Sequence, residues 1–71
     1  MKFNYCKLLG LMKELRITQT ALAYFIMIDP KTLNAKLNNR KGFRQWEIVA
    51  ICKCLRIPFS DIPKYFFTLE E

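Results

Sequence analysis

The segment TQTALAYFIMIDPKTLNAKLNN, residues 18–39, contains the clearest structural signals in the chain. Thr18 can cap a helix that begins just after it, because its hydroxyl accepts from a free backbone N–H group. Asp29 followed by Pro30 is a strong start signal for a second helix, since proline loses no intrahelical hydrogen bond at the first helical position. The apolar face of the first helix would consist of Leu22, Phe25 and Ile26. The segment therefore predicts two short helices joined by a turn of about three residues.

The second of these helices is expected to cover residues 30–38 and to lie on the surface. Leu33 and Leu37 are four residues apart, so both would point inward. The other side would carry mostly donors and short side chains, at Lys31, Thr32, Asn34, Ala35, Lys36 and Asn38. A polar helix of this kind is suited to enter the major groove of DNA, which accepts one α-helix.

Three further helices and no sheet are predicted outside this pair. One covers about residues 5–15 with Asn4 as its N-cap, and another covers about residues 44–55. Ser60 is expected to cap a short last helix that has Pro63 in its first turn. The predicted fold is all-α, a compact five-helix domain.

The core is expected to contain the large apolar side chains Trp46, Phe25, Phe43 and the leucines. Cys6, Cys52 and Cys54 are expected to be buried or half-buried thiols on helices, because an odd number argues against a disulfide framework. A zinc site would need Cys6 to join the other two, and the paired C-x-x-C spacing is absent. We expect no metal and no other cofactor.

With 71 residues, of which 52% are hydrophobic, the chain is expected to form one domain, residues 1–71. No stretch approaches the roughly 20 apolar residues of a membrane span, and the first residues lack signal-peptide features. A cytoplasmic protein without a membrane partner is expected. It has no histidine, no serine–base or paired-carboxylate arrangement and no glycine-rich phosphate loop, so neither an enzyme nor a small-molecule substrate is expected.

The charge of the chain favours a polyanionic partner. Its net charge is +6, from 12 basic and 6 acidic residues. Between residues 31 and 44 there are five basic residues and no acidic one: Lys31, Lys36, Arg40, Lys41 and Arg44. This concentration of charge next to the polar helix favours contact with a nucleic-acid backbone.

The pattern Gln19-x-x-Leu22-Ala23, followed by Ile28-Asp29-x-x-Thr32-Leu33, resembles the lambda-repressor and Cro-like helix-turn-helix family. Further matches are similar to small Cro-like proteins of phages that infect Gram-positive bacteria: Asn4-Tyr5-x-Lys7-Leu8-x-Gly10, Thr32-Leu33-x-x-Lys36-Leu37-Asn38, Gly42-Phe43, Ile57-Pro58 and Tyr65-Phe66-Phe67. The resemblance implies a lambda-repressor-like DNA-binding domain, with its helix-turn-helix unit at about residues 18–39, that acts in a lysis–lysogeny switch. It also implies a location at the nucleoid of a bacterial host cell.

The chain departs from that family in the turn, where Met27 stands in place of the usual glycine. Glycine adopts a positive φ without steric cost. Met27 must therefore take a strained backbone, or the turn must differ from the usual one.

Candidate DNA contacts fall into two groups. The candidates for base readout are Lys31, Thr32, Asn34 and Ala35. The candidates for phosphate contact are Thr18, Gln19, Lys36, Asn38, Asn39, Arg40, Lys41 and Arg44. The resemblance gives Gln19 a further role, bracing a side chain that reads a base. For Thr18, the capping role alone is an equally good explanation.

Two functions remain open from the sequence. The first is a Cro-like repressor that binds double-stranded operator DNA. The alternative is a modulator or antirepressor that uses the same fold to bind the phage repressor and alter its DNA binding. The aromatic tail, residues 64–71, is expected to pack partly on the domain and to offer the remainder as a surface for a homodimer or the phage repressor: Tyr65, Phe66, Phe67 and Leu69. The operator sequence, the oligomeric state and the sign of regulation stay open.

Overall fold

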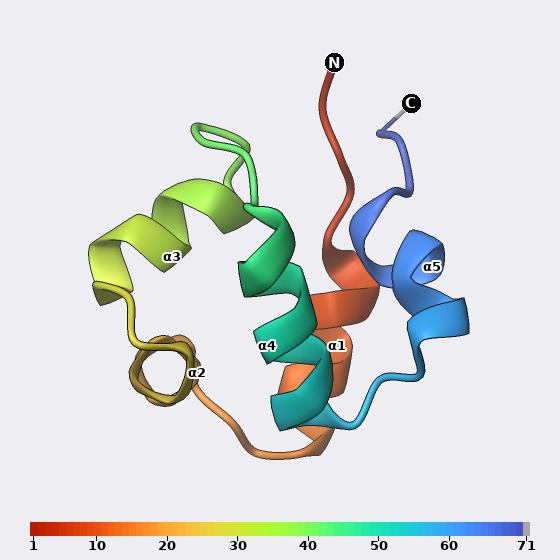
Figure 1. The fold of residues 1–71 in the computed structure, drawn as a ribbon. Helices are drawn as coiled ribbons and strands as arrows, with labels where there is room; N and C mark the ends of the chain where they lie inside the picture. The colour runs from red at the N-terminus through yellow and green to blue at the C-terminus, as the bar shows by residue number, and fades with distance from the viewer. Residues whose placement is uncertain (71) are drawn as a thin grey trace.

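The computed structural model describes residues 1–70, which fold into five α-helices and one short 3-10 helix (Figure 1). In chain order these are α1 (Cys6–Glu14), α2 (Gln19–Ile26), α3 (Pro30–Leu37), α4 (Gln45–Leu55), η1 (Phe59–Asp61) and α5 (Ile62–Phe66). Within the described residues there is no strand beyond an isolated bridge between Phe3 and Leu69. The predicted all-helical fold class is confirmed. None of the helices described is long and apolar enough to span a membrane.

The starts of α2 and α3 follow capping side chains. The Thr18 hydroxyl accepts from the Ala21 N–H at 3.1 Å, and the Asp29 carboxylate accepts from the Lys31 N–H at 2.7 Å. Both predicted caps are thus confirmed, with α2 and α3 beginning directly after them. The predicted cap at Ser60 is wrong, because this residue lies inside η1 and α5 begins after Asp61 without a side-chain cap.

The first four helices all end in a left-handed residue that is not glycine. The φ angles are 56° at Arg16, 62° at Met27, 64° at Asn39 and 58° at Arg56. At each of these ends, the next backbone N–H donates to a carbonyl five residues earlier, as in a Schellman motif. Met27 therefore takes the strained backbone that its position in the turn requires, and α3 can start three residues after it.

Three of the four residues that follow these ends are isoleucines: Ile17, Ile28 and Ile57. Each lies in the hydrophobic core or packs against it. The apolar contact made by such a residue commonly accompanies a Schellman motif. It fixes the direction in which the chain leaves the helix, and this explains how the chain turns sharply without glycine.

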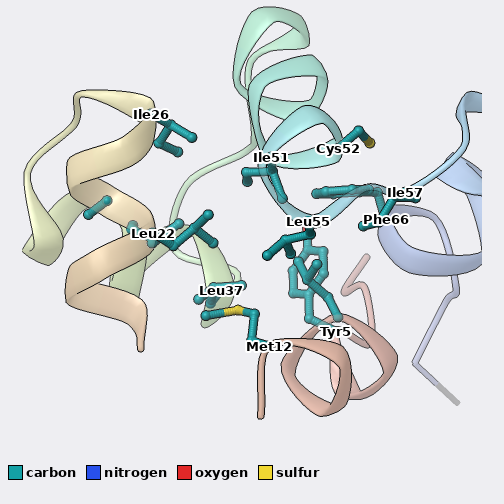
Figure 2. Close-up of a cluster of buried hydrophobic side chains, with 13 residues drawn as sticks. Tyr5, Met12, Leu22, Ile26, Leu37, Ile51, Cys52, Leu55, Ile57 and Phe66 are labelled. Atoms are coloured by element: carbon teal, nitrogen blue, oxygen red, sulfur yellow. The ribbon is translucent and has the colours of Figure 1, made fainter. Parts of the chain in front are cut away.

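The core lies between α1, α2 and α4, and Figure 2 shows Tyr5, Leu22, Ile51 and Leu55 converging there. Figure 1 shows α4 at the centre, with α2 and α3 on one side and α5 on the other. The helix α2 packs against α3 and α4, while α5 packs against α1 and α4. Five of the leucines are buried as predicted: Leu8, Leu22, Leu33, Leu37 and Leu55.

Several predicted core residues lie on the surface instead. Phe25 is 68% exposed, because the small Ala23 occupies the inner face of α2 next to Leu22. Trp46 is 51% exposed, since Glu47 and not Trp46 begins the buried side of α4. Other predictions of burial that are wrong concern Leu9, Leu15 and Cys6. Phe43 is half-buried and packs against the core.

The N-terminal segment and the C-terminal tail lie side by side (Figure 1). The Asn4 N–H donates to the Thr68 carbonyl at 2.7 Å, and the Glu70 N–H donates to the Lys2 carbonyl at 2.9 Å. Phe66 is only 1% exposed. The centroid of its ring lies 5.5 Å from that of the Phe43 ring, and the two rings meet edge to face. The assignment of Phe66 to a partner surface is therefore wrong, because α5 directs its side chain into the core.

We predict that Met27→Gly stabilises the protein by about 1 kcal/mol, because glycine removes the steric penalty of a left-handed backbone. Met27 is 88% exposed, so little buried apolar surface is lost. In a domain of this size the melting temperature should rise by about 4–8 °C, as measured by thermal unfolding followed by circular dichroism. The control is Met27→Ala, which loses the same exposed side chain but keeps the Cβ atom. Equal stabilisation by both variants would show that backbone strain is not the cause.

Candidate nucleic-acid interface

The helix α3 lies on the surface with one apolar side turned inward. Leu33 is fully buried and Leu37 is 8% exposed, so both hold α3 against the core as predicted. Three of the predicted outer residues are exposed, namely Lys31, Asn34 and Asn38, and two are half-buried, namely Thr32 and Ala35. The outer side of α3 is therefore polar and accessible along most of its length.

A shallow hollow at the junction of α2 and α3 brings together residues far apart in the sequence. Its lining consists of Gln19, Thr20, Pro30, Lys31, Asn34 and Arg40. Lys31, Asn34 and Arg40 were expected to face the same partner, and here they share one concave surface. Thr20 was not among the predicted site residues, although its place in the first turn of α2, beside Gln19, could have indicated it.

A hydrogen bond connects the two helices across this hollow. The Asn34 side-chain amide donates to the Gln19 side-chain carbonyl at 3.2 Å. The bond uses one amide hydrogen of Asn34 and leaves its other hydrogen and its side-chain oxygen free for a ligand. Gln19 therefore orients a side chain that can both donate and accept, consistent with the bracing role implied by the family resemblance.

Lys36 does not lie on the outer side of α3, and its prediction as a phosphate contact is wrong. It is 4% exposed, and its Nζ lies 2.5 Å from the Glu47 carboxylate. The same Nζ donates to the Gly42 carbonyl at 3.2 Å. The physical reason is that Glu47 is buried at 2% exposure, and a buried carboxylate needs a cation.

The sequence did contain a signal for this pair. Glu47, Ile51 and Leu55 are spaced four residues apart in α4, which places all three on one side of the helix. Since Leu55 was expected in the core with the other leucines, Glu47 on the same side of the helix had to be buried with it and required a partner. The nearest basic segment, residues 31–44, was the place to look for it.

The second half of the loop between α3 and α4 is fixed by this ion pair. Lys36 binds the Gly42 carbonyl, and the Glu47 carboxylate accepts from the Arg44 N–H at 2.7 Å. The side chains of Arg40, Lys41 and Arg44 stay exposed. Together with Lys31 they form a group of exposed cations in a segment, residues 31–44, that contains no acidic residue.

Asn39 is also turned away from the expected partner. Its side-chain oxygen accepts from the Phe3 N–H at 2.8 Å, and its amide donates to the Phe3 carbonyl at 2.9 Å. These two bonds hold both the oxygen and the nitrogen of the side chain on the N-terminal segment and direct it away from the outer side of α3, so its prediction as a phosphate contact is wrong. Asparagine suits this position because it tolerates the left-handed backbone and bonds to nearby main chain.

The remaining phosphate candidates lie at the helix ends. Thr18 is exposed and caps α2, and Gln19 is half-buried beside it. Asn38 is exposed, and its amide donates to the Asn34 backbone carbonyl at 2.8 Å, which closes the end of α3. All three side chains therefore have a local structural role in addition to any contact with a ligand.

The fold and the hollow define a small all-helical domain with a polar, cation-flanked concave surface on one exposed helix. The chain belongs to the family described as "Protein of unknown function (DUF739)", whose model matches residues 1–69. A comparison with curated proteins gave no match. The family description assigns no ligand, so the chemistry of the residues themselves must indicate what this surface binds.

We predict that Lys36→Met lowers the free energy of unfolding by about 3–5 kcal/mol, because it leaves the Glu47 carboxylate buried without its cation. The double variant Lys36→Met with Glu47→Gln should regain most of this loss, since the glutamine oxygen can still accept from the Arg44 N–H. Urea unfolding measures both values. The matched control is Lys41→Met, at an exposed position, where a change within about 0.5 kcal/mol is expected. Equal effects of Lys36→Met and Lys41→Met would contradict the account of the pair.

Proposed function

We propose that the chain is a sequence-specific DNA-binding transcriptional regulator, in which α2 and α3 form a helix-turn-helix unit. The observation that supports this most strongly is the shared hollow lined by Gln19, Lys31, Asn34 and Arg40 on the exposed side of α3. The amide and cationic groups in it are the ones that recognise base edges and phosphates.

The dimensions of α3 suit the major groove. A helix with its side chains is about 10–12 Å in diameter and the groove is about 12 Å wide, and the eight residues of α3 give it a length of about 12 Å. Lys31 is the second and Asn34 the fifth of these eight residues, and the N-terminal part of a recognition helix is the part that contacts base edges. The α2 N-terminus, at Thr18 and Gln19, would then face the phosphate backbone, where its free N–H groups favour an anion.

Base readout is assigned mainly to Asn34 and Lys31. Asparagine can pair in two places with adenine, and lysine can donate to guanine O6 and N7. The hydrogen bond from Asn34 to Gln19 reduces the freedom of the asparagine before DNA arrives. Thr32 and Ala35 are half-buried and are proposed for contact with a thymine methyl group or the adjacent backbone.

Phosphate contact is assigned to exposed groups on either side of α3. The cations are Arg40, Lys41 and Arg44, and the neutral groups are Thr18, Gln19 and Asn38. Lys36 and Asn39 are removed from this set because their side chains are used inside the domain. Three cationic phosphate contacts would give a slope of about −2.7 for log affinity against log salt.

The family resemblance extends this proposal to a Cro-like repressor in a phage lysis–lysogeny switch, acting on operator DNA at the host nucleoid. A homodimer or a complex with the phage repressor would use what remains exposed of the tail. Phe67 is 51% and Leu69 is 55% exposed, while Tyr65 is half-buried. The proposed partner surface therefore consists of these three side chains and no longer includes Phe66, which is buried.

The test begins with selection of duplexes from a random pool, followed by mobility shifts with the selected sequence and a scrambled one. Lys31→Ala with Asn34→Ala should remove most of the preference for the selected duplex, because each good base contact contributes about 1–3 kcal/mol of discrimination. The double variant Lys41→Ala with Arg44→Ala is the matched control. It should weaken binding to both duplexes equally and make the salt slope shallower by about 2.

Equal loss on both duplexes in the Lys31 and Asn34 variant would demote those residues to backbone contacts. A protein that selects no duplex, but changes the shift produced by a phage repressor, would contradict DNA recognition and favour the modulator role.

A further inference from the structure

Two apolar hollows adjoin on the side of the molecule formed by α1, α2 and α4. The first lies between α1 and the start of α2, and its lining includes Leu9 and Ile17. The second lies between α2 and α4, and its lining includes Ile17, Phe25 and Ala50. Because Ile17 lines both, the two hollows lie next to each other, and together we call them the α1–α2–α4 strip.

The strip has the apolar character of a surface that lacks its partner. Phe25 forms its wall and is 68% exposed, and Leu9 at the other end is 38% exposed. Ile17, Ala50 and Cys54 are half-buried and complete the lining. A phenylalanine exposed to this degree at the edge of a hollow is typical of an interaction site.

The charges on the strip have a single sign. Lys13 and Arg16 line the first hollow and Lys53 lines the second, and all three are exposed. Neither lining contains an acidic residue. The strip therefore combines an apolar floor with a basic rim.

We propose that the α1–α2–α4 strip docks an acidic amphipathic helix of another protein. The apolar residues of such a helix recur every three or four positions and can fill the two hollows in succession. Its carboxylates then face Lys13, Arg16 and Lys53, which makes the two surfaces electrostatically complementary. Docking buries Phe25 and Leu9, two of the large apolar side chains that the fold leaves exposed.

A second copy of this chain and a nucleic acid both suit the strip less well. In a two-fold dimer through this surface, the same three cations of each copy would lie in one interface and repel those of the other copy. Each copy also carries a net charge of +6, which adds to the repulsion. A nucleic-acid backbone would satisfy the cations but offers little apolar surface to cover Phe25 and Ile17. The strip meets the proposed DNA surface only at the start of α2, where Thr18 and Gln19 also line the first hollow, and the second hollow shares no residue with the hollow on α3.

The experiment uses a fluorescent helical peptide with leucine at positions i, i+3, i+4 and i+7 of each repeat and glutamate at most others. A twin peptide carries lysine in place of every glutamate. Fluorescence anisotropy with the full chain should show binding of the acidic peptide and none of the basic twin. Phe25→Ser should lower the affinity for the acidic peptide about tenfold or more. The matched control Tyr24→Ser should leave binding unchanged, because Tyr24 is 75% exposed on the same helix and does not line the strip.

The role of charge is tested with Lys53→Glu, at an exposed position. This variant should bind the acidic peptide more weakly, and the difference from the original protein should become smaller as the salt concentration rises. Failure of the acidic peptide to bind, or equal effects of Phe25→Ser and Tyr24→Ser, would overturn the proposal. Self-association in sedimentation that only Phe25→Ser abolishes would assign the strip to a second copy. A loss of duplex binding in Phe25→Ser alone would assign it to DNA.

Discussion

The buried ion pair between Lys36 and Glu47 determines how α3 is presented. Leu33 and Leu37 hold this helix against the core, but apolar contacts alone permit it to rotate about its axis. The Lys36 ammonium reaches the Glu47 carboxylate and the Gly42 carbonyl, which joins α3 to the first turn of α4. Such a pair contributes little net stability, because both charges lose their water. We infer that its role is to select one rotation of α3 and one path of the basic loop.

The rest of the candidate interface follows from that rotation. With Lys36 inside, Lys31 and Asn34 face outward over the start of α2, where Gln19 can bond to Asn34. Arg40 lies at the same hollow because α3 ends in a left-handed residue, Asn39, whose side chain is held by Phe3. The N-terminal segment thereby supports the end of α3, although it is distant from it in sequence.

The features that the sequence predicts correctly are those set by neighbouring residues. The caps at Thr18 and Asp29, the apolar spacing of Leu33 and Leu37 and the all-helical class depend on neighbours within a few residues, and the structure agrees with each of them. The errors at Lys36, Asn39 and Phe66 have one cause. In each case a distant segment supplies the partner, and single-residue polarity or size does not indicate it. Phe25 and Trp46 show the converse, since large apolar residues stay exposed where the opposite side of the helix is already filled.

The most direct test of the presentation of α3 is a ¹H–¹⁵N NMR titration of the chain with a DNA duplex. The account predicts that backbone amide shifts concentrate at residues 18–20, 31–35 and 40–44, while those of α5 and the tail stay nearly unchanged. Shifts confined to the tail or to α4 and α5, with residues 31–35 unaffected, would contradict it.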